Sequence, residues 1–268
     1  VHVRAGERIQ WYVSFFGGNA MSKMVEIRDV SLIYHELQGE TLALDGLNLD
    51  VAQGEFVSVV GPSGCGKTSM LSMLAGLMQP SCGSLWVGDS SPGYMLQRDH
   101  LLDWRTIEGN ILLGLEVKRM CSEETRAYAL SLLDKYGLYE FKNAYPRQLS
   151  GGMRQKVALI RTLACAPALL LLDEPFSALD FQTRVRLANE IYDIIRREEK
   201  TAILVTHDIS EAISMSDRVI VFSGRPAKVK AEHVLTLREQ TPLRRRSEDG
   251  FKEYFDAIWK ELDDYENQ

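Results

Sequence analysis

Gly61-Pro62-Ser63-Gly64-Cys65-Gly66-Lys67-Thr68 is the stretch that decides the fold, because it has the spacing GxxxxGK[ST]. It follows a short apolar run over residues 56–60, typical of a buried strand, and apolar residues recur at helical spacing over residues 71–78. A strand, a glycine-rich loop and a helix in this order predict a phosphate site. We expect the loop N–H groups to cradle phosphates, Lys67 to pair with the β- and γ-phosphates, and the Thr68 hydroxyl to bind Mg²⁺.

A second stretch, Leu169-Leu170-Leu171-Leu172-Asp173-Glu174, supplies carboxylates for the same site. Its four leucines predict a strand buried on both faces, and ligands of open α/β sheets bind at the carboxyl ends of the strands. We therefore expect Asp173 to hold Mg²⁺ through water and Glu174 to polarise the attacking water.

The rest of the pattern predicts an α/β fold in three parts. Residues 25–34 and 42–51 alternate apolar and polar positions, which predicts an antiparallel β subdomain. Residues 98–150 show helical patterns only, so we expect an inserted α-helical subdomain. Beyond residue 152, strands alternate with helices, which implies a parallel sheet covered on both sides. The other predicted segments are helices over 106–140 with a break before a cap at Ser122, helices over 152–166 and 182–199, strands over 202–205, 219–222 and 228–237, and a terminal helix with Phe251, Phe255, Ile258, Trp259 and Leu262 on one face.

Composition excludes several classes of protein. The 268 residues include 31 Lys and Arg against 37 Asp and Glu, for a net charge of −6, which argues against a general nucleic-acid binder. The longest apolar stretches are far shorter than the roughly 18 residues that a membrane span needs. Four scattered cysteines suggest neither a zinc site nor a disulfide framework, and no signal peptide is recognisable, so we expect a cytosolic protein.

Leu149-Ser150-Gly151-Gly152-Met153-Arg154-Gln155 distinguishes among phosphate-loop proteins, because LSGGxxQ resembles the signature of ATP-binding cassette (ABC) ATPases. Further motifs follow in the family's order along residues 25–237. Gln97 resembles the Q-loop glutamine, Ser177-Ala178-Leu179-Asp180 the D-loop, and His207 the switch histidine. Tyr34, 27 residues before Gly61, resembles the aromatic residue that stacks on adenine.

This resemblance implies a P-loop NTPase core with the family's site residues. The implied catalytic residues are Glu174, His207, Lys67 and Gln97, and the implied Mg²⁺ ligands are Thr68, Gln97 and Asp173. The residues implied to bind ATP are Tyr34, Gly61, Pro62, Ser63, Gly64, Cys65, Gly66, Lys67, Thr68, Ser69, Ser150, Gly151, Gly152, Gln155 and Asp180.

The resemblance also implies partners. In the family, the signature completes the nucleotide site of the opposite subunit in a head-to-tail dimer, so one phosphate loop and one signature require a second cassette from another chain, which we expect to be a homodimer partner. Integral membrane permease subunits would bind the dimer, an extracytoplasmic solute-binding protein would act indirectly, and no nucleic acid is expected. These partners would place the chain in the cytoplasm, peripheral on the inner face of the cell membrane.

Three segments resemble importer subunits of the nitrate, sulfonate and taurine type: Leu101-Leu102-Asp103-Trp104, Phe176-Ser177-Ala178-Leu179-Asp180 and Thr206-His207-Asp208-Ile209-Ser210-Glu211-Ala212. Importers of thiamine precursors or other pyrimidine-like solutes share these features and remain an alternative. A soluble, non-transport ABC ATPase acting on nucleic acid or ribosomes is the alternative of another class, and a small-molecule kinase is a third.

Departures from the subgroup's pattern lie near the expected permease-facing surface. Asp103 stands where proline is usual, and only 13 residues separate Gly83 from Gln97; Ser69 replaces threonine conservatively. Trp104, Leu101 and Leu102 either dock on the permease or pack inside the helical insert. Arg244-Arg245-Arg246 either faces anionic lipid or is a solvated turn.

These segments give expected domain limits. Residues 1–20, ahead of a possible initiation site at Met21, form an unstructured extension. The ABC ATPase domain spans 21–240, with its helical subdomain at about 98–150, and a helical tail spans 241–268.

Overall fold

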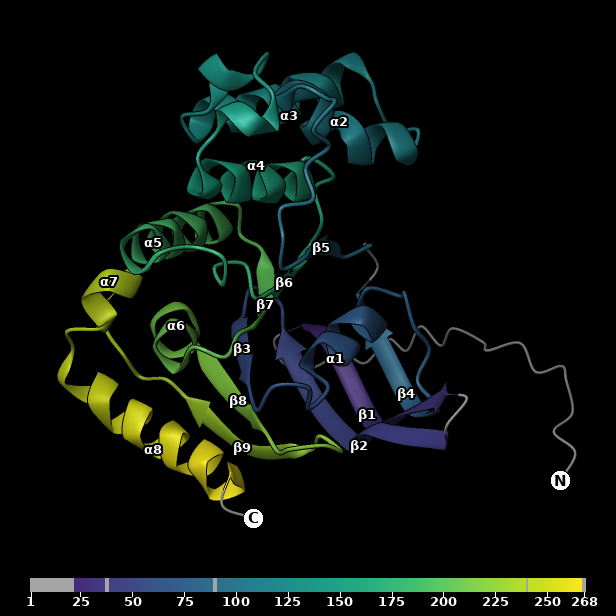
Figure 1. Ribbon diagram of the computed structural model, residues 1–268, viewed down its shortest axis with the longest axis vertical. Helices are drawn as coiled ribbons and strands as arrows, with labels where there is room; N and C mark the ends of the chain where they lie inside the picture. Colours follow the sequence, from purple (N-terminus) through teal and green to yellow (C-terminus); the bar gives the residue numbers. More distant parts are fainter. Residues whose placement is uncertain (1–21, 37–38, 89–90, 240, 267–268) are drawn as a thin grey trace, which may run out of the picture.

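The computed structural model describes residues 22–36, 39–88, 91–239 and 241–266 (Figure 1). The predicted extension over residues 1–20 and Met21 lie outside the described residues. The strands are β1 (Lys23–Glu36), β2 (Gly39–Ala52), β3 (Phe56–Val60), β4 (Cys82–Val87), β5 (Gly93–Met95), β6 (Leu169–Asp173), β7 (Thr201–Val205), β8 (Arg218–Phe222) and β9 (Val229–Val234). The α-helices are α1 (Lys67–Leu74), α2 (Ile107–Val117), α3 (Glu123–Lys135), α4 (Gly151–Leu163), α5 (Phe181–Arg197), α6 (Ile209–Met215), α7 (Pro242–Arg245) and α8 (Asp249–Glu266), with short 3₁₀ turns at Tyr139–Phe141 and Pro146–Gln148.

The strands form two sheets. β1 pairs antiparallel with β2 and with β4 in a three-stranded sheet, and the six-stranded sheet has the order β5-β6-β7-β3-β8-β9. The predicted antiparallel pair and the buried strands β3, β6 and β7 are confirmed. Two expectations are corrected: β4 and β5 are strands that the sequence pattern did not predict, and the large sheet is not wholly parallel, because β9 pairs antiparallel with β8.

The two faces of the six-stranded sheet are covered by different elements, because successive strand residues point to opposite faces. Val57 and Leu171 pack with α1 and the antiparallel sheet, whereas Phe56 and Leu172 pack with α4 and α5. Val60 faces α6 and α8. Figure 1 shows the resulting layers, with α1 and the antiparallel sheet on one side of β3 and α6 and α8 on the other. Every residue of β3, β6 and β7 is buried, so these three strands form the rigid centre of the molecule.

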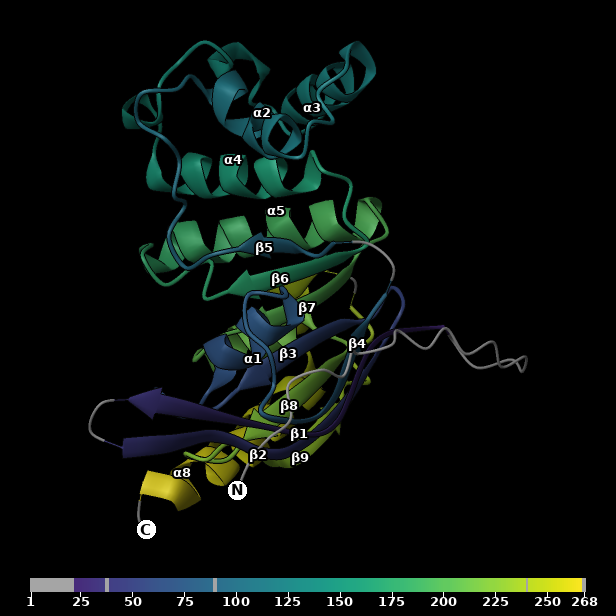
Figure 2. The ribbon, with the colours of Figure 1, turned by 90° about the vertical axis from the view of Figure 1, so that its right-hand side faces the viewer.

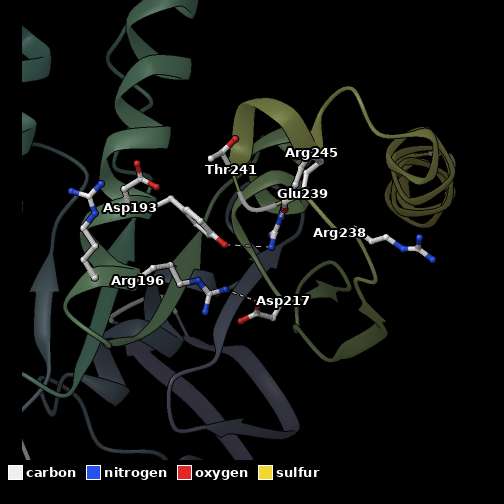
Figure 3. Close-up of a pocket in the computed structure, with 9 residues that line it drawn as sticks. Asp193, Arg196, Asp217, Arg238, Glu239, Thr241 and Arg245 are labelled. Atoms are coloured by element: carbon white, nitrogen blue, oxygen red, sulfur yellow. Dashed lines mark hydrogen bonds and ion pairs between the residues drawn. The ribbon is translucent and has the colours of Figure 1, made fainter.

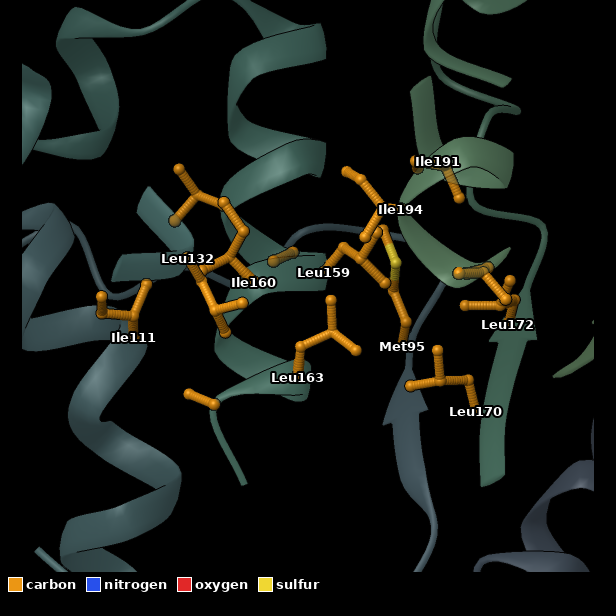
Figure 4. Packing of buried hydrophobic residues seen from close by; sticks show 14 of the residues in the cluster. Met95, Ile111, Leu132, Leu159, Ile160, Leu163, Leu170, Leu172, Ile191 and Ile194 are labelled. Carbon is orange, nitrogen blue, oxygen red and sulfur yellow. The ribbon is translucent and has the colours of Figure 1, made fainter. Parts of the chain in front are cut away.

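Helices α2, α3 and α4 stack above the sheet, with α4 between the other two and α5 (Figure 2). Ile160 of α4 faces Leu132 and Ile111 in the upper helices, while Leu159 faces Ile194 of α5 (Figure 4). The predicted cap at Ser122 is confirmed, since its hydroxyl accepts a hydrogen bond from the Thr125 N–H. This packing makes α4 the link between the upper helices and the sheet.

The C-terminal segment packs on the sheet through α8. The predicted terminal helix is confirmed as α8: Ile258 is fully buried against α6 and β8, whereas Trp259 is 56% exposed and stacks on Phe255. Both interpretations of the arginine run are wrong for Arg245, because its guanidinium is buried and bound to the carbonyls of Ser214 and Ser216, whereas Arg244 is exposed. Within the described part of the chain, no helix combines the length and apolarity required to cross a membrane.

Candidate active site

The phosphate loop joins the end of β3 to the start of α1, as its sequence predicted. Gly64 and Gly66 have φ values of 73° and 123°, which L side chains rarely adopt. A Cβ atom on Gly66 would lie 2.9 Å from Leu44 Cδ2 and 3.1 Å from the Ala43 carbonyl oxygen. The loop therefore requires glycine at residue 66 both for its backbone turn and for its packing on β2.

Lys67 lies inside the loop that it follows. Its ammonium donates to the Gly61 and Pro62 carbonyls at 2.7 and 2.9 Å, and the residue is only 6% exposed. A buried cation is tolerated when hydrogen-bond acceptors surround it. The charge is thus held at the mouth of the loop, beside the N-terminus of α1, where phosphate anions are favoured.

Thr68 and Asp173 bring two hard oxygen donors together from α1 and β6. The Thr68 hydroxyl donates to Asp173 Oδ1 at 3.3 Å, and the Tyr94 hydroxyl of β5 donates to Asp173 Oδ2 at 3.3 Å. Burial raises the pKa of the Asp173 carboxyl, while these two hydrogen bonds oppose the rise. Burial also raises the pKa of Tyr94 to about 12, so its hydroxyl remains a donor at neutral pH.

Glu174 follows Asp173 with an unusual backbone and two side-chain partners. Its φ is 44°, a conformation that costs about 1–3 kcal/mol in a non-glycine residue and is often found at functional sites. Its N–H donates to the Val205 carbonyl at 2.8 Å, which ties the turn to β7. His207 Nδ1 lies 3.2 Å from Glu174 Oε1, and Gln97 Nε2 donates to Glu174 Oε2 at 3.3 Å. The fold therefore brings Gln97, Glu174 and His207 together beyond the carboxyl ends of β5, β6 and β7.

Tyr34 lies beside the start of α1. Its hydroxyl shares a hydrogen bond of 2.9 Å with Ser69 Oγ and lies 3.5 Å from Met78 Sδ. Strand β1 thus places an aromatic ring next to the phosphate loop, although Tyr34 precedes Gly61 by 27 positions in the sequence.

The signature segment lies elsewhere in the chain. Ser150 caps α4, and Cβ atoms on Gly151 and Gly152 would meet Leu179 and Thr183 at 3.1 and 3.2 Å. Gln155, which is 4% exposed, donates to the Gln97 carbonyl at 3.5 Å. Among the described residues, no hydrogen bond or ion pair joins residues 150–155 to the phosphate loop. Asp180 caps α5, and the hydrogen bonds it accepts from Thr183 lower the pKa of its carboxyl.

Comparison with known proteins decides the family. The family model described as ABC transporter matches residues 44–177. An uncharacterized ABC transporter ATP-binding protein, YtlC of Bacillus subtilis, is 45% identical over 91% of this chain and 97% of its own length. The chain belongs to the ATP-binding proteins of ABC transporters.

Other relatives of this ABC ATPase have named solutes. The nitrate import protein NrtD of Synechocystis is 38% identical over 87% of this chain and 93% of its own, and the taurine import protein TauB of Yersinia pestis is 41% identical over 75% and 81%. A dimeric, post-hydrolysis structure of the ATP-binding cassette MJ0796 bound to ADP and Pi superposes with a TM-score of 0.68 and 31% identity, covering 81% of this chain and 100% of that one. The predicted P-loop NTPase fold and the ATPase activity are thereby confirmed.

Two residues beside the site of this ABC ATPase belong to no sequence motif. Tyr94, whose hydroxyl donates to Asp173, lies in the three-residue strand β5, and only the parallel pairing of β5 with β6 brings it to Asp173. Arg225 lies in the turn between β8 and β9, and its Nε and Nη2 donate to the Gly64 carbonyl at 3.2 and 2.9 Å. The dipeptide Arg225-Pro226 after a predicted strand marks a turn, but nothing in the sequence pairs it with the phosphate loop.

A cavity of about 450 Å³ lies away from these residues, between α5 and the segment around α7 (Figure 3). Arg196 is bound to Asp217, and Arg245 to the Tyr192 hydroxyl and to backbone carbonyls. Arg238 points away from the other side chains. Because the inward arginines are already bonded, the cavity is part of the C-terminal packing and not the nucleotide site.

Proposed function

We propose that this ABC ATPase powers the uptake of a small solute of the nitrate, sulfonate or taurine type through a separate permease. The observation that carries the hydrolytic part is the meeting of Lys67, Thr68, Asp173, Glu174 and His207 at the carboxyl ends of β3, β6 and β7. The crossover connections of the chain bring these residues to the carboxyl ends of the strands, which is where open α/β sheets bind ligands.

Each residue at this site has a chemical part in hydrolysis. Loop N–H groups and the Lys67 ammonium hold the β- and γ-phosphates and stabilise charge on the transferring phosphoryl group. The Glu174 carboxylate orients the attacking water and accepts its proton, and His207 contacts the γ-phosphate. Tyr34 stacks on adenine. Gln97 contacts Glu174 and Ser177, so it reports the state of the site to the helices above.

The donor set also fits Mg²⁺. The Thr68 hydroxyl and Asp173 carboxylate are hard oxygen ligands 3.3 Å apart. Gln97, whose Nε2 donates to Glu174 Oε2, carries an amide oxygen of the same ligand type. When bound, Mg²⁺ neutralises phosphate charge; the chain's part is to orient these oxygens, with Tyr94 fixing the second oxygen of Asp173.

Assembly as a head-to-tail dimer accounts for the separated signature. Ser150, Gly151 and Gly152 form a helix N-terminus suited to an anion, yet among the described residues no hydrogen bond or ion pair joins them to the phosphate loop. A second copy would bring its signature to this chain's ATP. The dimeric MJ0796 structures support this arrangement.

The permease surface is proposed at the segment after Gln97. Leu101 is 9% exposed and belongs to the apolar core, whereas Trp104 is 75% exposed. These exposures support Leu101 as a packing residue and Trp104 as the candidate permease contact. The nitrate and taurine importers among the relatives support the solute class, and pyrimidine-like solutes remain the alternative.

The experiment uses the tagged Glu174→Gln variant, extracted from membranes with ATP present, followed by identification of the co-purifying proteins. We expect a polytopic permease and an extracytoplasmic binding protein. Lys67→Ala is the control that should lose ATP-dependent recovery, and Trp104→Ala should lose the permease, and the binding protein with it, while ATP binding is kept. Recovery from the soluble fraction with DNA or ribosomes would overturn transport while leaving the ATPase assignment intact.

A further inference from the structure

A cluster of polar side chains lies behind the His207 loop and has no part in the mechanism above. Thr206 and Glu211 are only 2% and 3% exposed, and Arg184 and Asp208 adjoin them. Arg184 comes from the first turn of α5, whereas the other three belong to residues 206–211 at the start of α6, and the two helices pack side by side (Figure 1). A buried charged cluster requires partners for each member.

Glu211 binds both neighbours of His207. The Thr206 hydroxyl donates to Glu211 Oε2 at 2.8 Å, and the Asp208 N–H donates to the Thr206 hydroxyl oxygen at 3.0 Å. The Glu211 N–H in turn donates to Asp208 Oδ1 at 3.1 Å. The residues before and after His207 are therefore joined in a closed ring of hydrogen bonds through Glu211.

Arg184 connects this ring to the turn that precedes α5. Its Nη2 donates to the Leu179 carbonyl at 3.2 Å, immediately before Asp180, and its Nη1 donates to Asp208 Oδ2 at 3.5 Å. Its Nε lies 3.7 Å from Glu211 Oε1 and has no hydrogen-bond partner among the described residues. One guanidinium thus reaches the D-loop turn, the cap of α6 and the buried carboxylate. Only a planar fork of donors can serve all three.

We propose that Arg184 and Glu211 act as one positioning unit that holds the His207 loop and the Leu179–Asp180 turn in register for hydrolysis. The inference rests on the proposed roles of Glu174 and His207. Neither member of the pair touches the reacting atoms, because each acts through the loop it holds. A misplacement of about 1 Å in a catalytic group can reduce a rate about 100-fold, so a pair behind the site can limit turnover.

The hydrogen bond from Thr206 does not require a charge on residue 211, because a glutamine oxygen could accept it as well. The attraction to Arg184 does require the ionised Glu211 carboxylate. Burial raises the pKa of the Glu211 carboxyl to about 7, and the Asp208 charge adds to this rise. The Thr206 hydrogen bond and the charges of Arg184 and Arg246 oppose it. The attraction between Arg184 and Glu211 therefore weakens as pH falls below about 7, and turnover should fall with it.

The test compares Glu211→Gln, Arg184→Lys and the double variant with the wild-type protein. Arg186→Lys on the exposed side of α5 and Glu253→Gln on α8 are matched controls. The measurements are kcat and KM for ATP from pH 6 to 9, the Kd for ATP, and the melting temperature. Glu174→Gln is included to test the proposed function itself.

We expect each single variant to lower kcat about 10- to 100-fold at pH 8 with little change in the Kd for ATP. The double variant should be no slower than the slower single variant, because residues acting as a unit are not additive. Glu211→Gln should also lose the part of the acid limb that Glu211 causes, because the amide does not titrate.

Singles with wild-type kcat, effects that multiply, or an unchanged acid limb in Glu211→Gln would each overturn the proposal. A lower melting temperature with unchanged kcat would do so too, as it indicates a structural role only. If Glu211→Gln does not fold, Arg184→Lys alone decides by its kcat. Unimpaired turnover by Glu174→Gln would instead remove the proposed function, a result distinguishable from all of these.

Discussion

The nucleotide site around Asp173 and Glu174, called the hydrolytic edge below, and the cavity beside α5 and α7 both contain many charged side chains. The two regions differ in how these side chains are hydrogen-bonded. At the edge, Asp173 and Glu174 make contacts of 3.2–3.3 Å, at the long end of hydrogen bonding. In the cavity, Arg245 bonds the Glu239 and Ser216 carbonyls at 2.8 Å and the Ser214 carbonyl and Tyr192 hydroxyl at 3.3 Å, and Arg196 lies 2.5 Å from Asp217. Charge density alone therefore does not mark a site; the two regions differ in that Arg245 is bonded on all three guanidinium nitrogens, whereas the Asp173 and Glu174 side chains have long contacts only.

Glu174→Gln gives the largest expected effect and tests the first half of this comparison. Loss of a general base lowers kcat by about 10²- to 10⁴-fold. The phosphate loop is unaltered, so the Kd for ATP should stay unchanged. Phosphate release and equilibrium ATP binding measure the two quantities, with Glu253→Gln as the control. Near-normal turnover would show that the strained carboxylate is not the base.

Arg245→Met tests the second half, because its charge is bonded internally. Removal of the guanidinium leaves the Ser214 and Ser216 carbonyls and the Tyr192 hydroxyl without their donor. Unsatisfied buried groups cost about 1–3 kcal/mol each, so we expect the free energy of unfolding to fall by about 3 kcal/mol.

Urea unfolding measures that loss, and the kcat of the folded Arg245→Met variant should remain within about twofold of wild type, because distant sites act independently. Exposed Arg244, which lies 3.8 Å from Glu239, supplies the matched control Arg244→Met with little loss of stability. A large loss of kcat without loss of stability would make the cavity a functional site and end the contrast.

Glu211 combines features of both regions. It is buried like Arg245, but it is a carboxylate whose ionisation in the folded state lowers the stability of the protein. Its pKa is about 7 in the folded chain against 4.5 unfolded, so the folded state retains a proton that the unfolded state releases between these values. Stability is therefore lost as pH rises through this window, by up to about 3 kcal/mol.

Glu211→Gln lacks this titration. We expect it to be more stable than wild type at pH 8, with the difference vanishing near pH 4.5. Urea unfolding at both pH values gives the result, and Glu253→Gln should show no such divergence. Equal stability of wild type and Glu211→Gln at pH 8 would mean that Arg184 and Arg246 fully offset the burial of the charge.

Sequence patterns predicted the parts of the fold that repeat a simple rule. Continuous apolar runs indicated β3 and β6, and the phosphate-loop spacing indicated the turn between β3 and α1. β4 was missed because it is an edge strand with exposed positions, and β5 because three residues are too few to show a period. Motif order placed Lys67 and Glu174, but Tyr94 and Arg184 reach the site through strand pairing and helix packing, which one-dimensional spacing does not encode.

Tyr94→Phe has the smallest expected effect, and it tests whether one long hydrogen bond to Asp173 supports Mg²⁺ binding. The Tyr94 hydroxyl donates to Asp173 Oδ2 at 3.3 Å, and the phenyl ring keeps the packing of β5 while removing this donor. Partners of metal-binding carboxylates change metal affinity by about 10- to 100-fold, and because this bond is long we expect the lower figure. The Mg²⁺ concentration for half-maximal ATPase activity should therefore rise about tenfold, with kcat restored at saturating Mg²⁺.

The control is Tyr254→Phe, because the Tyr254 hydroxyl bonds Thr236 far from the site. An unchanged Mg²⁺ requirement would show that Tyr94 only fills space, and that long contacts at this edge do not by themselves identify a residue that supports the ion.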